Sequence, residues 1–270
     1  MYPELFHLSF LHTYGVLVAI AFLTGLWMAG RLGKEAGLNV EAVTNLGIYC
    51  ALAAIVGAKL MMIIVSLPEY AADPRRIFTF ETLQAGGVFY GGLIGALGVA
   101  WWYMRKTKLP PLKTADVFAP GVALGHGIGR LGCFSAGCCW GIECHRPWAV
   151  TFTNPAANDI TGVPLNRPLH PTQLYEAFSE FVIFGILYWR VRRAHAAGEV
   201  IGLYLLLYST VRFIVEFFRT HEQGNLWGGP LDTSQWISIG LFLLGAYFYF
   251  VKSRAPQPGV TSSTPRSSPA

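Results

Sequence analysis

The chain has 270 residues, of which 53% are hydrophobic and only 13% are charged. An average soluble domain carries roughly 25% charged residues, so the composition argues against an ordinary water-soluble protein. The formal net charge of +5 does not indicate nucleic-acid binding, because the basic residues lie in short clusters between apolar segments and not along one continuous face.

Apolar segments of about 20 residues, long enough to cross a hydrocarbon core about 30 Å thick, recur along almost the whole sequence. They predict an all-α polytopic membrane protein with about seven transmembrane helices and a single transmembrane domain over residues 1–252. The predicted spans are residues 11–30, 44–67, 86–104, 115–132, 171–191, 199–218 and 234–252. No Lys or Arg precedes the first span, so we expect it to be retained and not cleaved as a signal peptide.

Basic residues follow the odd-numbered spans, for example Arg31 and Lys34 after the first and Arg192 and Arg193 after the fifth. The positive-inside rule therefore predicts a periplasmic N-terminus and a cytoplasmic C-terminus. Residues 253–270 are rich in Pro and Ser, which predicts a disordered cytoplasmic tail. The long interruption at residues 133–170 is predicted to form a periplasmic cap between the fourth and fifth spans, with a few short extended pieces.

Glycines recur around Tyr90 in the segment GGVFYGGLIGALG, residues 86–98. Close helix packing explains most such glycines, and clearance for a substrate is the alternative. Tyr90 is a candidate site residue, because a phenol among glycines has little to pack against and could face a cavity.

Arg130 follows VALGHGIG, where several glycines remove side-chain bulk and allow a ligand or another backbone to approach closely. A charged residue inside an apolar segment is by default a functional candidate. Its planar guanidinium suits the binding of a phosphate group.

Four of the five cysteines fall within one segment, at positions 133, 138, 139 and 144. Their spacing does not reveal whether they form disulfides. It matches no familiar zinc pattern either, so we expect no metal ligands.

The segment RPLHPTQLYEAF, residues 167–178, places His170, Gln173, Tyr175 and Glu176 at the predicted entry of the fifth span. These polar groups either bind a substrate or satisfy one another and cap the helix.

Arg212, Glu216 and Arg219 are spaced i, i+4 and i+7 in the sixth span. This spacing places them on one helical face and makes an ion pair between Arg212 and Glu216 possible. The face should point into the bundle, either as a functional site or as a structural ion pair between helices.

Taken together, four motifs resemble the prolipoprotein diacylglyceryl transferase family, and their order and spacing also fit. The motifs are GGVFYGGLIG at 86–95, GRLGCFSAGCCWG at 129–141, HPTQLYE at 170–176 and RFIVEFFR at 212–219. The segment His-Thr-Tyr-Gly at 12–15 is similar to the Tyr-Gly of the family's first span. The resemblance covers nearly all seven predicted spans.

The resemblance implies a bacterial inner-membrane enzyme that transfers diacylglyceryl from phosphatidylglycerol to the lipobox cysteine of a preprolipoprotein signal peptide, releasing glycerol-1-phosphate. It also implies that the protein is surrounded by membrane lipids and uses no metal or other cofactor. Arg130 and Arg212 match the family's essential arginines, and Arg212 is expected to stabilise the leaving phosphate while Arg130 grips the head group. His170 or Tyr90 could relay the thiol proton. The expected substrate-binding residues are Arg130, Tyr14, Gly141, Gln173, Tyr175, Glu176, Tyr208, Glu216 and Arg219.

The chain departs from the family pattern at three positions. Cys133 and Cys138 stand where the signature usually has Asn and Glu, and Tyr90 stands where a His often precedes the glycine pair. We interpret the chain as a cysteine-rich variant of the same enzyme. Two other classes compete with this interpretation: a thiol oxidoreductase using the Cys133–Cys144 segment, which lacks a C-x-x-C pair, and a lipid or solute transporter, for which no repeat is visible.

Overall fold

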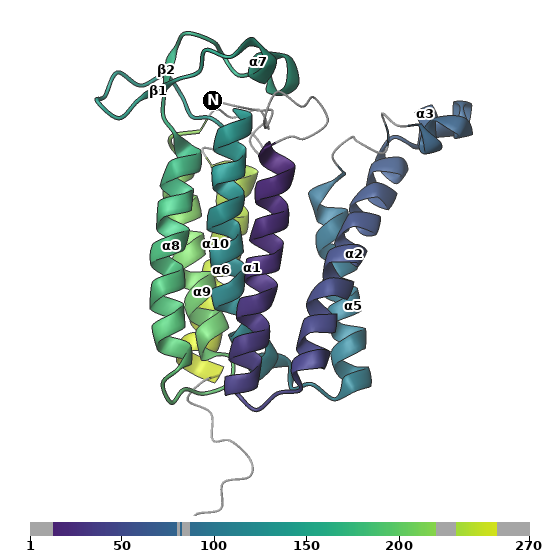
Figure 1. The fold of residues 1–270 in the computed structure, drawn as a ribbon, viewed down its shortest axis with the longest axis vertical. Coiled ribbons are helices and arrows are strands. Elements are labelled where there is room, and N and C mark those ends of the chain that lie inside the picture. Colours follow the sequence, from purple (N-terminus) through teal and green to yellow (C-terminus); the bar gives the residue numbers. More distant parts are fainter. Residues whose placement is uncertain (1–12, 80–81, 83–86, 220–230, 253–270) are drawn as a thin grey trace, which may run out of the picture.

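A computed structural model describes residues 13–79, 82, 87–219 and 231–252. The predicted disordered tail at 253–270 lies outside these residues. Seven helices of 14 or more residues are described, and they run roughly alongside one another (Figure 1). They are α1 (Thr13–Glu35), α2 (Val40–Val65), α5 (Phe89–Thr107), α6 (Pro111–Ala136), α8 (Thr172–Val191), α9 (Glu199–Glu216) and α10 (Thr233–Ala246), which continues into the π-helical segment η3 (Tyr247–Val251). The short elements are α3 (Leu67–Ala72), η1 (Pro74–Phe78), β1 (Val150–Thr151), α7 (Pro155–Thr161) and β2 (Pro168–Leu169).

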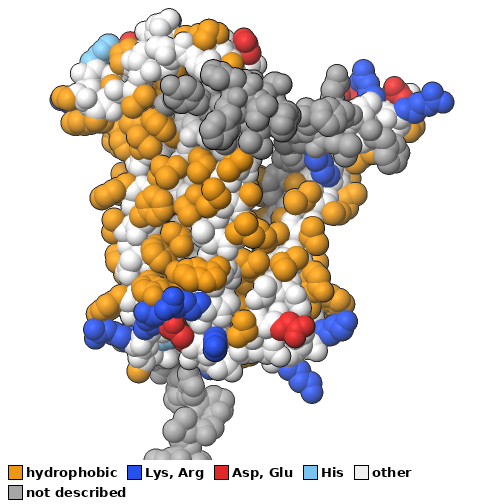
Figure 2. All heavy atoms as spheres, viewed as in Figure 1, with side chains coloured by type: hydrophobic (Ala, Val, Ile, Leu, Met, Phe, Trp, Pro, Cys, Tyr) orange, Lys and Arg blue, Asp and Glu red, His pale blue; other side chains and the backbone are white. Residues whose placement is uncertain are grey.

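The described chain is mostly helical, which agrees with the predicted all-α membrane protein. By length and apolarity alone, three described helices could cross a membrane: Thr13–Glu35, Val40–Val65 and Thr233–Val251. The other long helices contain the charged residues discussed below. Hydrophobic side chains dominate the middle of the surface, whereas charged side chains gather toward its two ends (Figure 2).

Helix α6 lies at the centre of the main bundle and packs against α1, α8 and α9. Glycines permit a close crossing of α1 and α6: a Cβ on Gly25 of α1 would meet the backbone of Gly121 of α6. The α6–α8–α9 interface is filled by apolar side chains such as Ala123, Leu187 and Val200. Polar side chains on these three helices are therefore brought together inside a packed core.

Helices α2 and α5 form a second close pair, which joins the main bundle through contacts between α2 and α1. Gly91 and Gly95 of α5 face the backbone of α2 near Gly57 and Ala53, leaving no room for a Cβ. The close-packing interpretation of the glycine-rich segment is thus confirmed at Gly87, Gly91, Gly92 and Gly95, whereas a Cβ at Gly98 would meet nothing within 4 Å.

A small cap, residues 137–171, connects α6 and α8 at one end of the bundle (Figure 1). Its strands β1 and β2 pair antiparallel, with Val150 opposite Leu169. Phe152, Ala157 and Val163 form its own apolar core. The cap begins later than predicted because α6 continues through residues 133–136 and ends at Gly137, whose φ of +80° suits a left-handed helix terminus.

Candidate active site

Glu176 joins three arginines in the interior of the main bundle. It lies in the first turns of α8 and is 3% exposed. Its Oε2 lies 2.6 Å from Arg130 Nη2, and its Oε1 lies 3.5 Å from Arg219 Nη1 and 3.7 Å from Arg212 Nη1. We call these four residues the Glu176 cluster. Arg130, Glu176 and Arg212 come from α6, α8 and α9, whereas Arg219 follows the end of α9 at Glu216 and so does not share its helical face as predicted. The fold alone brings these distant segments together.

Arg212 has further partners. Its Nη1 lies 2.5 Å from Glu216 Oε2, one turn later in α9. Its Nη2 donates a hydrogen bond of 3.2 Å to Ser234 Oγ of α10. The ion pair predicted from the i, i+4 spacing is therefore present, and it faces the interior as expected.

His126 and Glu180 extend the cluster along α6 and α8, although neither was predicted as a site residue. Arg130 Nε donates to His126 Nε2 at 3.3 Å, and His126 Nδ1 lies 2.9 Å from Glu180 Oε1. The Tyr208 ring lies with its centroid 5.5 Å from that of His126. A signal was available: His126 precedes Arg130, and Glu180 follows Glu176, by one helical turn.

Each buried arginine has a carboxylate partner. The Arg130, Arg212 and Arg219 side chains are each less than one-fifth exposed, and Glu176 or Glu216 lies within 3.7 Å of each guanidinium. Charges removed from water are tolerated only when paired. The network therefore holds its guanidiniums in fixed directions, which is the condition for electrostatic stabilisation of a reacting group.

Gly141 joins the cap to the end of α9. Its N–H donates to the His170 carbonyl at 3.0 Å, and the next N–H, of Ile142, donates to the Phe218 carbonyl at 2.9 Å. A Cβ on Gly141 would collide with the Phe218 carbonyl oxygen and with His170 Cβ. Since Gly141 also forms a bridge with Arg219, this close approach fixes the backbone that carries an arginine of the Glu176 cluster.

His170 lies in the cap beside the start of α8. Its Nδ1 is 2.9 Å from the Tyr175 hydroxyl, and its ring packs on Phe218. Partial burial, followed by the positive charge of Arg146, lowers the pKa of His170 below its ordinary value. A neutral imidazole at pH 7 can accept a proton.

The remaining predicted site residues lie at different distances from the Glu176 cluster. Gln173 is fully buried, and its Nε2 donates to the Cys138 carbonyl at 2.6 Å, so it supports the cap backbone. Tyr14 of α1 lies against Gly132 of α6, two residues from Arg130. Tyr90 is 48% exposed on α5, and none of the described contacts connects it to the Glu176 cluster.

An apolar cavity of about 440 Å³ lies between α1, α2 and α6. Its walls include Val18 and Phe22 of α1, Ala51 of α2, and Gly125 and Gly129 of α6. Gly129 directly precedes Arg130, but the Arg130 guanidinium is directed to Glu176 of α8 and does not line this cavity.

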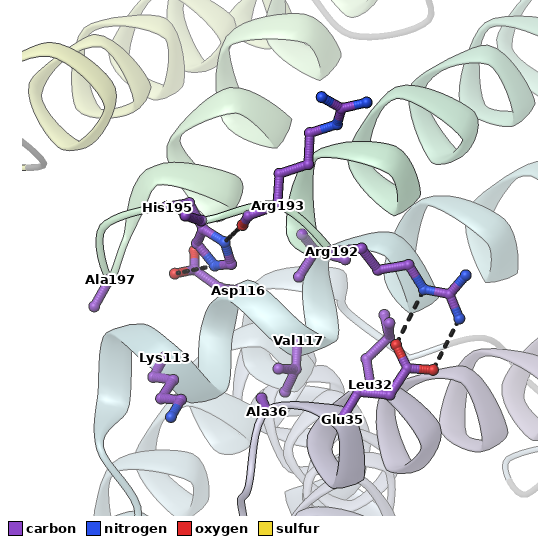
Figure 3. Close-up of a pocket in the computed structure, with 12 residues that line it drawn as sticks. Leu32, Glu35, Ala36, Lys113, Asp116, Val117, Arg192, Arg193, His195 and Ala197 are labelled. Carbon is purple, nitrogen blue, oxygen red and sulfur yellow. Dashed lines mark hydrogen bonds and ion pairs between the residues drawn. The ribbon is translucent and has the colours of Figure 1, made fainter.

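Another pocket, of about 450 Å³, lies where α6 begins and α8 ends (Figure 3). Asp116 accepts hydrogen bonds from the backbone N–H groups of Gly198, at 2.6 Å, and Ile201, at 2.8 Å, at the start of α9. Arg192 donates to both Glu35 carboxylate oxygens, at 3.0 and 2.8 Å. Both carboxylates already have partners that hold helix ends together, which indicates a structural role.

Architecture and site together define a helical membrane protein with a buried arginine–carboxylate cluster and a separate apolar cavity. A family model described as "Prolipoprotein diacylglyceryl transferase" matches residues 3–251, and the chain belongs to this family.

Several curated relatives carry the corresponding name. The phosphatidylglycerol–prolipoprotein diacylglyceryl transferase of Clostridium tetani is 36% identical over 252 residues, covering 92% of this chain and 97% of the relative. The second transferase so named in Clostridium perfringens is 33% identical, covering 91% and 92%. The Vibrio campbellii relative is 35% identical, covering 86% and 83%.

Proposed function

We propose that this protein transfers the diacylglyceryl group of phosphatidylglycerol to the lipobox cysteine thiol of preprolipoproteins, the first step of lipoprotein maturation. Family membership over nearly the whole chain supports this function, and so do the names of the relatives. The single structural observation that supports it is the Glu176 cluster, because three buried arginines in one place suit the binding of the acidic head group that the reaction must cleave. Neither an oxidoreductase nor a transporter needs this arrangement.

The proposal includes seven spans in the bacterial inner membrane and an outward-facing cap. The end of the bundle opposite the cap carries the basic residues that end α1, α5 and α8, among them Lys34, Arg105 and Arg190. By the positive-inside rule this end is cytoplasmic, so the N-terminus is periplasmic and the C-terminus is cytoplasmic. The Glu176 cluster then lies in the outer half of the membrane. We assign residues 1–252 to one catalytic domain with its cap.

In the reaction, the lipobox thiolate attacks the glyceryl carbon that bears the phosphate. A carbon–sulfur bond forms, the carbon–oxygen bond to phosphate breaks, and glycerol-1-phosphate leaves with the electron pair. Negative charge grows on the departing oxygen, where a fixed guanidinium gives the greatest stabilisation. We assign this role to Arg212, and the binding of the head group to Arg130. Tyr208, Glu216 and Arg219 orient these guanidiniums, and the apolar cavity beside Gly129 receives acyl chain.

The thiol proton needs an acceptor, because a free thiol has a pKa of about 8.5 and only a small fraction is thiolate at neutral pH. Of the two relay residues expected from the sequence, His170 has the better environment, since its lowered pKa keeps it neutral and it contacts the Tyr175 hydroxyl. Tyr90 lies on the helix pair outside the cluster.

The direct test uses purified protein, phosphatidylglycerol vesicles and a synthetic lipobox peptide. The expected product is a peptide with a thioether-linked diacylglyceryl group, accompanied by an equal amount of glycerol-1-phosphate. A peptide with Ser in place of the lipobox Cys is the control. If no thioether product forms under conditions in which a family relative is active, the proposed function is wrong.

A further inference from the structure

Three cysteine thiols converge at the junction of α6 and the cap. The sulfur atoms of Cys133, Cys138 and Cys139 all lie within 4.8 Å of one another. All three side chains are partly buried, and none of them is in a disulfide. We call them the three-thiol cluster. A disulfide would use only two of these thiols, whereas their common proximity suits a ligand that contacts all three.

The local backbone explains why these thiols converge. Cys133 lies in the last turn of α6, and the chain reverses at Gly137, which has a φ of +80°. The Cys138 N–H then donates back to the Cys133 carbonyl at 3.1 Å. Cys139 has a φ of +61°, a left-handed conformation that non-glycine residues adopt rarely. Surrounding structure must therefore hold this turn in place.

Two fully buried side chains of α8 hold the turn. Thr172 Oγ1 donates to the Cys139 carbonyl at 2.8 Å, and Gln173 Nε2 donates to the Cys138 carbonyl at 2.6 Å. Both anchors bind backbone carbonyls, so they leave the thiols available. The sulfur atoms are consequently held close together before any ligand binds, which reduces the entropic cost of binding.

Two cationic side chains lie near the three-thiol cluster, since the positive charges of Arg219 and Arg130 act on Cys139. The same arginines would offset the net negative charge that three thiolates keep after binding one cation. Thiolate sulfur is a soft ligand that selects soft metal ions such as Cu(I) and Zn(II) over Mg(II) or Ca(II).

We propose that Cys133, Cys138 and Cys139 form a binding site for one soft, thiophilic metal ion, with the three sulfur atoms as its protein ligands. Each thiol loses its proton to solvent when its metal–sulfur bond forms. Cu(I) would be held by the three sulfurs, and Zn(II) would add a water molecule as fourth ligand. Sequence spacing alone matched no metal pattern, because the left-handed turn brings the thiols together.

The test uses the full-length protein in detergent, reduced and freed of metal, with Cd(II) as the probe. Cadmium–thiolate bonds absorb in the ultraviolet, so titration should give a band that saturates at one equivalent. The triple variant C133S/C138S/C139S should lose this band. C50S and C144S are the matched controls, since each removes a thiol outside the cluster, and both should keep it.

A second measurement needs no variant. In wild-type protein, bound Cd(II) should protect Cys133, Cys138 and Cys139 from alkylation at least tenfold, while Cys50 reacts at an unchanged rate. Peptide mass spectrometry reads each position. Absence of saturable binding to fully reduced protein, or protection equal at all five cysteines, would overturn the proposal. Neither measurement involves lipid or peptide substrate, so the outcome is independent of the proposed transferase function.

Discussion

Arg130 Nη2 lies 2.6 Å from Glu176 Oε2, and the Arg130 and Glu176 side chains are only 15% and 3% exposed. The pair connects α6 to α8 at the point where Arg212 and Arg219 also arrive. An anionic head group that binds Arg130 must therefore share this guanidinium with Glu176. We infer that Glu176 offsets the mutual repulsion of the three guanidiniums and fixes their directions.

Replacing Arg212 should remove transfer. We expect Arg212→Ala to lower the transfer rate by at least about 100-fold, the loss typical of removing one preorganised charge donor. Arg212→Lys should restore little of the transfer rate. The lysine ammonium is a point charge and cannot reproduce the contacts that the planar guanidinium makes with Glu216 and Ser234. Rates are measured with the vesicle assay on variants that remain folded by circular dichroism.

Arg31→Ala is the matched control, since Arg31 is half exposed at the far end of α1. It should keep wild-type rates. Wild-type turnover in Arg212→Ala would mean that the Arg212–Glu216 pair is purely structural.

Glu176→Gln should lower both stability and activity. The change keeps the side-chain shape but leaves three buried guanidiniums with fewer opposing charges, and breaking a buried ion pair typically costs about 3–5 kcal/mol. Thermal unfolding in detergent should therefore occur at a clearly lower temperature than in wild type. Glu143→Gln, at a half-exposed position of the cap, should have no measurable effect. Equal unfolding temperatures for Glu176→Gln and wild type would show that the Glu176 charge does not stabilise the buried arginines.

Gly141→Ala should separate activity from folding of the bundle. The added Cβ would collide with Phe218 and His170 and so displace Arg219, while the α6–α8–α9 core is untouched. We expect a loss of transfer of at least tenfold with helix content unchanged. Gly185→Ala is the control, because a Cβ at Gly185 meets nothing within 4 Å. Full activity in Gly141→Ala would show that the cap tolerates this displacement.

The transfer rate should depend on the protonation of His170. Because its pKa is lowered, His170 is neutral above pH 7 and accepts the thiol proton there, so the rate should be highest above neutrality and fall as the pH decreases. The midpoint should lie below the ordinary histidine value of about 6.5. His170→Asn should lower the rate and remove this acidic limb from the profile. If the limb persists in His170→Asn, another group is the base.

In the transfer reaction without metal, Cys133 and Cys138 should act as packing groups and not as covalent catalysts. Cys133→Asn and Cys138→Ser, measured without added metal, should keep substantial transfer, because the corresponding Asn and Glu of the family supply no thiol. Mass spectrometry of a stalled reaction should find no diacylglyceryl adduct on either residue. An adduct that converts into product would refute this prediction.

The long helices and the contacts within one helix could be predicted from the sequence, because both depend on residues that are close together along the chain. Apolar length predicted the long helices, and the i, i+4 spacing of Arg212 and Glu216 predicted their ion pair, since one helical turn sets that contact. The glycine-rich segment around Gly91 was correctly interpreted as close helix packing for the same reason.

Only the tertiary structure decided which distant groups meet. Glu176 joins Arg130 and Arg212 because α6, α8 and α9 pack together, and His126 reaches Glu180 across the same interface. Tyr90 lies outside the cluster because its helix, α5, pairs with α2. Helical periodicity determines which face of its own helix a residue occupies, but side-chain packing determines which helix lies opposite that face.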